Sequence, residues 1–190
     1  MFYTGLTWVT TPQKEANVKH LCILLSFLPA WAMALTIQPG QPLPQVEIRQ
    51  AGELELNNNE ITYQPWSSQE LSGKVRLIHA IAGRSSAKKL NAAMIEAVKQ
   101  AKFAEQSYQT VTVVNLNDAM FGTSGLVKSK LKKNKQQFPH ASFVLDEAGA
   151  LFEQWQLKSK SSAIILVDAK GKVIFAKEGE LQADEIKQVL

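Results

Sequence analysis

The segment KVRLIHAIAGRSSAK, residues 74–88, indicates how this chain folds. From Lys74 to Ile81 it is apolar and rich in β-branched residues, which is typical of a central strand buried on both faces. After Gly83 the apolar period becomes that of a helix running to about Phe103, with one face made of Ala87, Leu90, Met94, Ala97, Val98 and Ala101. A buried strand that leads directly into a helix predicts part of a parallel α/β sheet.

Strands and helices continue to alternate toward the C-terminus. The predicted elements are a strand at residues 110–116, a lysine-rich helix that Pro139 ends, a strand at 142–145, a short helix at 151–157, a hairpin at 163–176 and a helix at 183–190. Parallel strands need crossover helices, and a closing hairpin adds antiparallel strands at one edge. The predicted fold class is therefore α/β, a mixed sheet with helices on both faces.

An extended lead and a hairpin precede this core. Residues 35–50 are predicted to form the lead and a first strand, because Pro39, Pro42 and Pro44 cannot donate to a sheet. Asn57–Asn59 is predicted to turn a hairpin, and Ser67 with Glu70 has the spacing of a capping box for one helical turn. Residues 51–190 are then predicted to form one domain.

The N-terminal residues 1–34 resemble a secretory signal. Lys19 and His20 precede an apolar run from Leu21 to Leu28, and Ala32-Met33-Ala34 supplies a small-x-small end. Cleavage is predicted after Ala34. Residues 1–17 are long for the region that precedes the apolar run of a signal, so either the signal is extended or translation begins nearer Val18. The apolar run is far shorter than the ~20 residues that a membrane span needs. The alternative is a buried helix of the domain. Export predicts a periplasmic protein.

The composition of the chain excludes several classes of protein. With 45% hydrophobic and 20% charged residues the chain is an ordinary globular protein, and its net charge of +4 is too small to indicate nucleic-acid binding. Its single cysteine, Cys22, excludes a disulfide framework, a cysteine-rich zinc site and an iron–sulfur cluster. Because Cys22 lies within the predicted signal, the mature chain has no cysteine at all.

The order of elements resembles the thioredoxin superfamily. The early part of the chain resembles its peroxiredoxin and cytochrome-maturation branch in the residues Gly40, Pro44, Val46, Ile48, Gly52, Leu54, Leu71, Gly73 and Lys74. Several unusual stretches follow one another in order: Tyr63-x-x-Trp66-Ser67-Ser68, Gly73-Lys74-Val75-Arg76, His79-x-Ile81-Ala82-Gly83-Arg84-Ser85-Ser86-Ala87-Lys88 and Ser161-Ser162-Ala163-Ile164. In these stretches the chain is similar to the YtfJ family of small periplasmic proteins. This resemblance implies a thioredoxin-like fold and a periplasmic location, and no established activity.

The same resemblance directs attention to the turn from Gly83 to Ser86. Active members of the superfamily carry a thiol there, since a helix N-terminus stabilises a thiolate. Here serines stand in its place, and Ser161-Ser162 occupies the position of the expected cis-proline. Serine cannot cycle through a disulfide, so thiol–disulfide exchange and thiol peroxidase chemistry are excluded.

Two interpretations of this turn stay open. Arg84, Ser85, Ser86 and Lys88 form a candidate site for phosphate, for a carboxylate or for an acidic partner segment. Alternatively, a serine caps the helix while a local carboxylate such as Asp118 pairs with Arg84.

Other candidate groups are weaker. His79 and His140 have no diagnostic spacing to a serine, so neither predicts a hydrolase or a metal site. The lysines from Lys128 to Lys135 can contact anionic lipid or another acidic surface, or form a solvated face. Three aromatic residues can line a groove or belong to the core: Trp66, Phe152 and Trp155.

The sequence therefore predicts a binding or interaction module without redox activity, with no catalytic residue, metal or cofactor. Its expected partner is a periplasmic protein or a small anionic ligand, with no nucleic acid and no membrane span. The alternative is an enzyme of unrecognised chemistry that uses Ser85 or Ser86 with Arg84 at the same turn.

Overall fold

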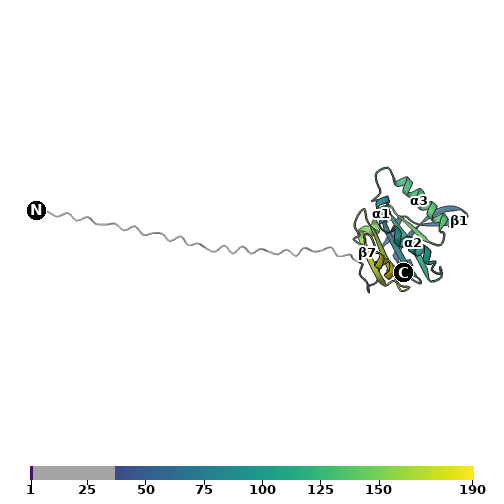
Figure 1. Ribbon diagram of the computed structural model, residues 1–190. Helices are drawn as coiled ribbons and strands as arrows, with labels where there is room; N and C mark the ends of the chain where they lie inside the picture. The colour runs from purple at the N-terminus through teal and green to yellow at the C-terminus, as the bar shows by residue number, and fades with distance from the viewer. Residues whose placement is uncertain (2–36) are drawn as a thin grey trace. The chain divides into compact units, whose positions relative to one another are not determined.

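The computed structural model describes residue 1 and residues 37–190, so the predicted signal of residues 1–34 lies outside the described residues except for Met1. The elements are β1 (Glu47–Asn57), β2 (Glu60–Ser67), the 3-10 turn η1 (Ser68–Leu71), β3 (Val75–Ala82), α1 (Ser85–Leu90), α2 (Ala92–Ala101), β4 (Tyr108–Asn115), α3 (Ser124–Gln137), β5 (Ser142–Asp146), α4 (Ala150–Gln154), β6 (Ser162–Val167), β7 (Val173–Glu178) and α5 (Ala183–Val189) (Figure 1).

The strands form one seven-stranded sheet in the order β2-β1-β5-β4-β3-β6-β7. Strands β3, β4 and β5 run parallel, and the pairs that involve β1, β2, β6 and β7 are antiparallel. The central strand β3 is buried on both faces through most of its length, as its apolar run predicts. The predicted mixed sheet is confirmed.

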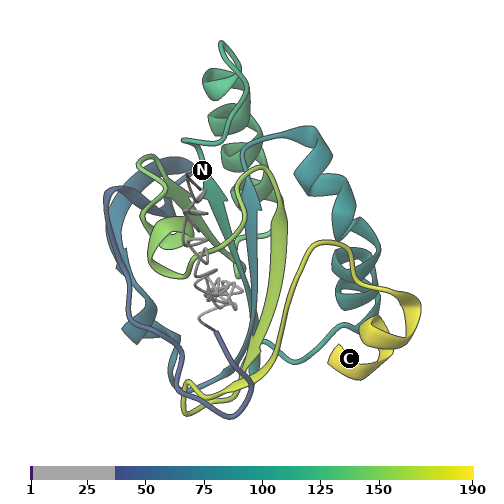
Figure 2. The ribbon, with the colours of Figure 1, turned by 90° about the vertical axis from the view of Figure 1, so that its left-hand side faces the viewer.

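Helices cover both faces of this sheet. On β3, Leu77 and Ile81 lie four residues apart and share one face, which packs against α2, α3 and α5. Ile78 and Ala80 point to the other face, where α4, η1 and the lead residue Ile37 complete the core. Figure 2 shows α2 and α5 on one side of the sheet and α4 on the other. Residues 37–190 lie in one compact unit, which contains all three hydrophobic clusters.

The structure departs from the predicted long helix at Asn91. This residue separates α1 from α2, and its backbone has φ −118° and ψ 24°. The apolar period continues across the break, since Ala87, Met94 and Val98 are all buried. Periodicity alone therefore predicted one helix where the structure has two.

Strand β1 continues beyond residue 50, the predicted end of the first strand. Its register against β2 shifts between Ile48 and Glu53, where Ala51 and Gly52 both have positive φ. An added Cβ at Gly52 would lie 2.0 Å from the main-chain oxygen of Gln64. The bulge therefore needs glycine both for its conformation and for the close approach of β2.

Replacing Gly52 is expected to destabilise the domain more than replacing a glycine in open space. Gly52→Ala should lower the free energy of unfolding by about 3 kcal/mol, since backbone strain adds to a clash with β2. Gly171→Ala is the matched control, because Gly171 also has positive φ but no atom within 4 Å of an added Cβ. It should cost about 1 kcal/mol. Urea unfolding measures both, and equal losses would contradict this account of the bulge.

Candidate functional site

The turn predicted to carry the site begins where β3 ends, beside the end of β4. The N–H of Gly83 donates to the main-chain oxygen of Asn115 at 2.8 Å. A Cβ at residue 83 would lie 2.9 Å from the same oxygen. Glycine thus permits the close approach of the two chain segments, and the sheet sets the position of the turn.

Arg84 holds this turn to the loop after β4. Its side chain donates from Nε at 2.8 Å and from Nη2 at 2.5 Å to the main-chain oxygen of Asp118. The sequence analysis predicted that the carboxylate of Asp118 could pair with Arg84. Arg84 does contact Asp118, but through the main-chain carbonyl group of that residue. Because this contact occupies two guanidinium donors, the main role of Arg84 is to position the turn after β3 against the loop after β4.

The carboxylate of Asp118 binds a third loop. Its Oδ2 accepts from the N–H of Lys160 at 2.8 Å and from Nδ2 of Asn115 at 3.3 Å. Lys160 has φ 58°, and the next residue, Ser161, accepts from the N–H of Ala82 at 3.0 Å. Asp118 therefore joins the loop after β4 to the turn after β3 and to the segment before β6.

The remaining predicted site residues face solvent. Ser85, Ser86, Lys88 and its neighbour Lys89 are exposed. The residue at the N-cap of α1 is Arg84, it makes no side-chain cap hydrogen bond, and the first turn contains no acidic residue. The prediction that Ser85 or Ser86 caps the helix is therefore wrong. Among the described residues no hydrogen bond or ion pair involves the side chains of these four residues.

Beneath the turn lies a buried chain of polar side chains. Nε2 of His79 and Oγ of Ser162 are 3.0 Å apart, and Nδ2 of Asn91 donates to the same Oγ at 3.0 Å. These three side chains come from β3, β6 and the break between α1 and α2, and none is more than 4% exposed. The hydroxyl of Ser162 therefore accepts a hydrogen bond from Asn91 and can donate one to His79.

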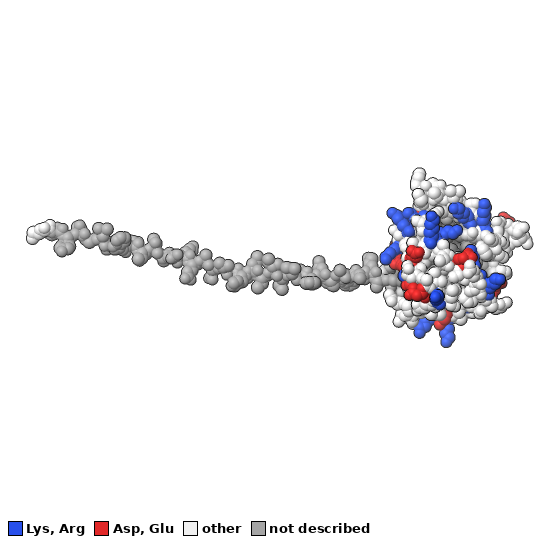
Figure 3. Space-filling model, viewed as in Figure 1, with Lys and Arg blue, Asp and Glu red and all other residues white. Residues whose placement is uncertain are grey.

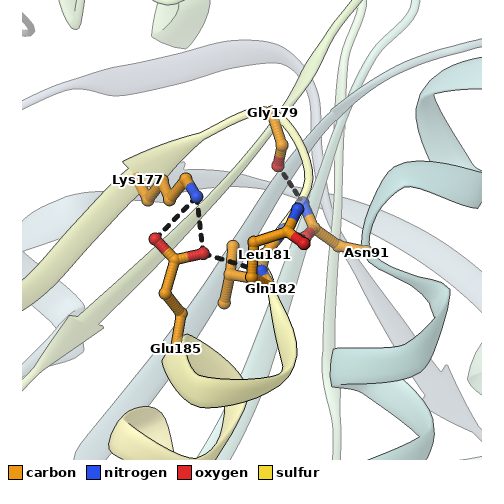
Figure 4. Close-up of polar contacts among 6 residues, drawn as sticks. All are labelled: Asn91, Lys177, Gly179, Leu181, Gln182 and Glu185. Carbon is orange, nitrogen blue, oxygen red and sulfur yellow. Dashed lines mark hydrogen bonds and ion pairs between the residues drawn. The ribbon is translucent and has the colours of Figure 1, made fainter.

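Asn91 extends this chain to the segment between β7 and α5 (Figure 4). Its Nδ2 donates to the main-chain oxygen of Gly179 at 2.9 Å, and its Oδ1 accepts from the N–H of Leu181 at 3.1 Å. Separate contacts hold the start of α5: Glu185 accepts hydrogen bonds from the N–H of Gln182 at 2.7 Å and from Lys177 at 2.6 Å. Those contacts lower the pKa of Glu185, with the bond from Lys177 the larger cause.

Sequence reasoning missed Asn91 and the role of Ser162 in this chain. One local signal for Asn91 was present: asparagine is unfavourable inside a helix, because its amide competes for hydrogen bonds. Its partners could not be predicted, since they lie 71 to 90 residues away along the chain.

Burial decides the charge state of His79. Loss of solvent, and secondarily the positive charge of Lys88, lowers the pKa of His79 from 6.5 to about 3. The imidazole is therefore neutral near neutral pH, and its Nε2 can then accept a hydrogen bond from the hydroxyl of Ser162. His79 does not act as a base for Ser85 or Ser86, because its Nε2 contacts Ser162 inside the domain.

The other candidate residues are largely structural. The three aromatic residues Trp66, Phe152 and Trp155 are at most 5% exposed and belong to the core on the α4 face of the sheet. Of the lysines on α3, Lys128 pairs with Glu147 at 2.5 Å, Lys132 lies 5.7 Å from the centre of the Tyr63 ring, and Lys135 donates to two main-chain oxygens. Lys130 and Lys133 have no such contact within the described chain.

A separate hollow of about 610 Å³ lies near the opposite edge of the sheet. It is lined by Phe103 from the segment between α2 and β4, by Tyr108 at the start of β4, and by Phe138 and His140 from the segment between α3 and β5. His140 contacts Glu105 there at 3.2 Å, with both side chains exposed. Within the described residues no group of three or more His, Cys, Asp or Glu side chains could hold a metal ion.

Acidification is expected to destabilise the domain through His79. The unfolded chain takes up a proton as pH falls through 6.5, whereas folded His79 does so only near pH 3, so stability falls with pH across that interval. The loss has an upper limit of about 1.4 kcal/mol per pH unit. Urea unfolding between pH 7 and about 5 measures it above the range in which carboxylates titrate.

His79→Gln removes the titrating group and can keep a donor near Ser162, so this variant should lose the slope. The matched control, His140→Gln, alters an exposed histidine and should keep it. An identical slope in wild-type protein and in His79→Gln would contradict the assignment.

Comparisons with known proteins agree with the fold. A family model described as "Bacterial protein of unknown function (YtfJ_HI0045)" matches residues 37–190. An uncharacterized protein of Haemophilus influenzae is 42% identical over 177 residues, covering 93% of this chain and 95% of that protein. The uncharacterized protein YtfJ of Escherichia coli is 41% identical over 172 residues, covering 90% and 94% respectively.

Solved structures support the fold alone. A putative thiol:disulfide interchange protein DsbE from Chlorobium tepidum superposes with a TM-score of 0.52 at 18% identity, covering 80% of this chain and 94% of that one. The C-terminal domain of a putative thiol-disulfide oxidoreductase from Bacteroides thetaiotaomicron gives 0.55 at 14% identity, covering 80% and 93%. The fold is thioredoxin-like, and the chain belongs to the YtfJ family.

Proposed function

We propose that this protein is an exported, periplasmic binding module that uses a thioredoxin-like scaffold without redox chemistry. Support for export comes from the signal-like sequence of residues 1–34, and support for the absence of thiol chemistry comes from a chain without cysteine after residue 34. Where a thiol would stand on this scaffold, the chain has Arg84-Ser85-Ser86. A fold by itself assigns no activity, so the function rests on the turn.

The observation that carries the proposal is the set of unpaired polar and cationic groups on the turn. Ser85, Ser86, Lys88 and Lys89 are exposed, and none of their side chains has a partner among the described residues. Arg84 and Asp118 fix the position of this turn through their hydrogen bonds to neighbouring loops. The proposed ligand is a phosphate-like anion or an acidic segment of a partner protein, which can accept hydrogen bonds from both lysines and both serines.

The alternative is an enzyme that uses Ser85 or Ser86 with Arg84. A serine nucleophile needs a base within hydrogen-bond reach. Neither serine has a basic side chain at that distance in the described part of the chain, and Arg84 is engaged by Asp118. These contacts favour binding over catalysis.

Removing the two free lysines is expected to weaken anion binding. The protein is purified from periplasm, where its N-terminal residue should be Leu35. It is then titrated with inorganic phosphate and, separately, with a poly-glutamate peptide while backbone NMR signals are followed. Signals of residues 85–89 should shift. Lys88→Ala/Lys89→Ala should lower the affinity at least about tenfold, because hydrogen bonds to charged groups are lost.

Lys170→Ala/Lys172→Ala is the matched control, since both lysines are exposed on the distant β6–β7 turn. It should bind as the wild type does. Binding of neither probe, or an equal loss in both variants, would overturn the anion site, and recovery of the protein only from the cytoplasm would overturn export.

A further inference from the structure

Three large apolar side chains are exposed within the short segment that leads from β4 into α3. Met120 is 61% exposed, Phe121 107% and Leu126 64%. These three residues form the apolar tip. Figures 1 and 2 show the loop after β4 and the first turn of α3 projecting beyond the rest of the domain. Clustered apolar groups of this kind mark surfaces that contact a partner or a membrane.

Hydrogen bonds order the chain that carries the apolar tip. Thr123 donates to the main-chain oxygen of Met120 from its N–H at 3.0 Å and from its hydroxyl at 2.7 Å. The N–H of Ala119 donates to Leu116 at 2.9 Å, and the N–H of Val127 donates to Thr123 at 3.1 Å. The tip is thus held outward by its own backbone, which reduces the conformational entropy lost on docking.

Free lysines share a helix face with the apolar tip. Leu126, Lys130 and Lys133 are spaced i, i+4 and i+7 on α3, so they lie on one side of the helix. Both lysines are exposed and unpaired within the described chain, and α3 contains no acidic residue. Figure 3 shows Lys and Arg side chains gathered in the upper half of the viewed face, below an uncharged projection, with most acidic side chains lower down.

We propose that the apolar tip inserts into the headgroup region of an anionic lipid bilayer while Lys130 and Lys133 contact its phosphates. A convex projection favours lipid over a protein partner, because lipids can rearrange around a protruding aromatic ring, whereas a protein must offer a matching hollow. Lysines beside the insertion point match the negative surface of the bilayer. This is peripheral docking: no helix within the described residues is long and apolar enough to cross a membrane.

Vesicle co-sedimentation tests this proposal. The chain from Leu35 onward, which contains the compact unit, is mixed with vesicles of equal parts phosphatidylglycerol and phosphatidylcholine, and separately with phosphatidylcholine alone. Binding is expected only to the anionic vesicles. Met120→Ser/Phe121→Ser should lower the partition coefficient more than about tenfold, because two apolar side chains no longer leave water. Lys130→Ala/Lys133→Ala should lower it by about fivefold per lysine.

Ile174→Ser is the matched control for the apolar tip, since Ile174 is 51% exposed on the edge strand β7. This variant should bind vesicles as the wild type does, and urea unfolding should show that all variants are folded. Absence of vesicle binding, or an equal loss in Ile174→Ser, would overturn membrane docking.

The poly-glutamate peptide separates this proposal from the anion site on α1. Binding of the peptide through the apolar tip and α3, without any binding to vesicles, would assign the surface to a protein partner and overturn the membrane proposal. Vesicle binding that survives Lys88→Ala/Lys89→Ala supports membrane docking even if the anion site fails its own test.

Discussion

The side chain of Asn91 makes the contacts on which the arrangement of this domain depends. One amide group reaches β6 through Ser162 and the segment between β7 and α5 through Gly179 and Leu181. Ser162 in turn contacts His79 on the central strand. All three polar side chains are buried, and an unpaired buried polar group costs about 1–3 kcal/mol, so the loss of one partner penalises the others as well. Asn91 makes these contacts from the break between α1 and α2.

This buried chain is one of two sets of polar contacts that hold the edge of the sheet at which β3 ends. The edge at which β3 ends is ordered from below by Asn91, Ser162 and His79, and from the side by Asp118, which binds both Arg84 and Lys160. What projects from this fixed edge is polar on α1 and apolar after β4. A frame held by these hydrogen bonds therefore presents one polar and one apolar surface to solvent.

The sequence predicted what depends on local pattern. The buried run of β3, the hairpin turned by Asn58 and Asn59 and the helical face of Met94 and Val98 all follow from spacing within a few residues, and each is found. It failed where long-range contacts decide. Arg84 contacts the carbonyl group of a residue 34 positions away along the chain. Asn91, which lies between two helices, binds partners that are still more distant in sequence. Exposure of the apolar tip is likewise a tertiary property, since hydrophobicity alone would place Met120 and Phe121 in the core.

A double-mutant cycle between Asn91 and Ser162 tests the central claim that they act as one unit. Asn91→Ala, Ser162→Ala and the double variant are compared by urea unfolding with the wild type. If the two side chains depend on each other, the double variant loses less stability than the two single variants added together, with a coupling energy of about 1 kcal/mol or more. Strictly additive losses would contradict the claim that this buried chain organises the edge of the sheet.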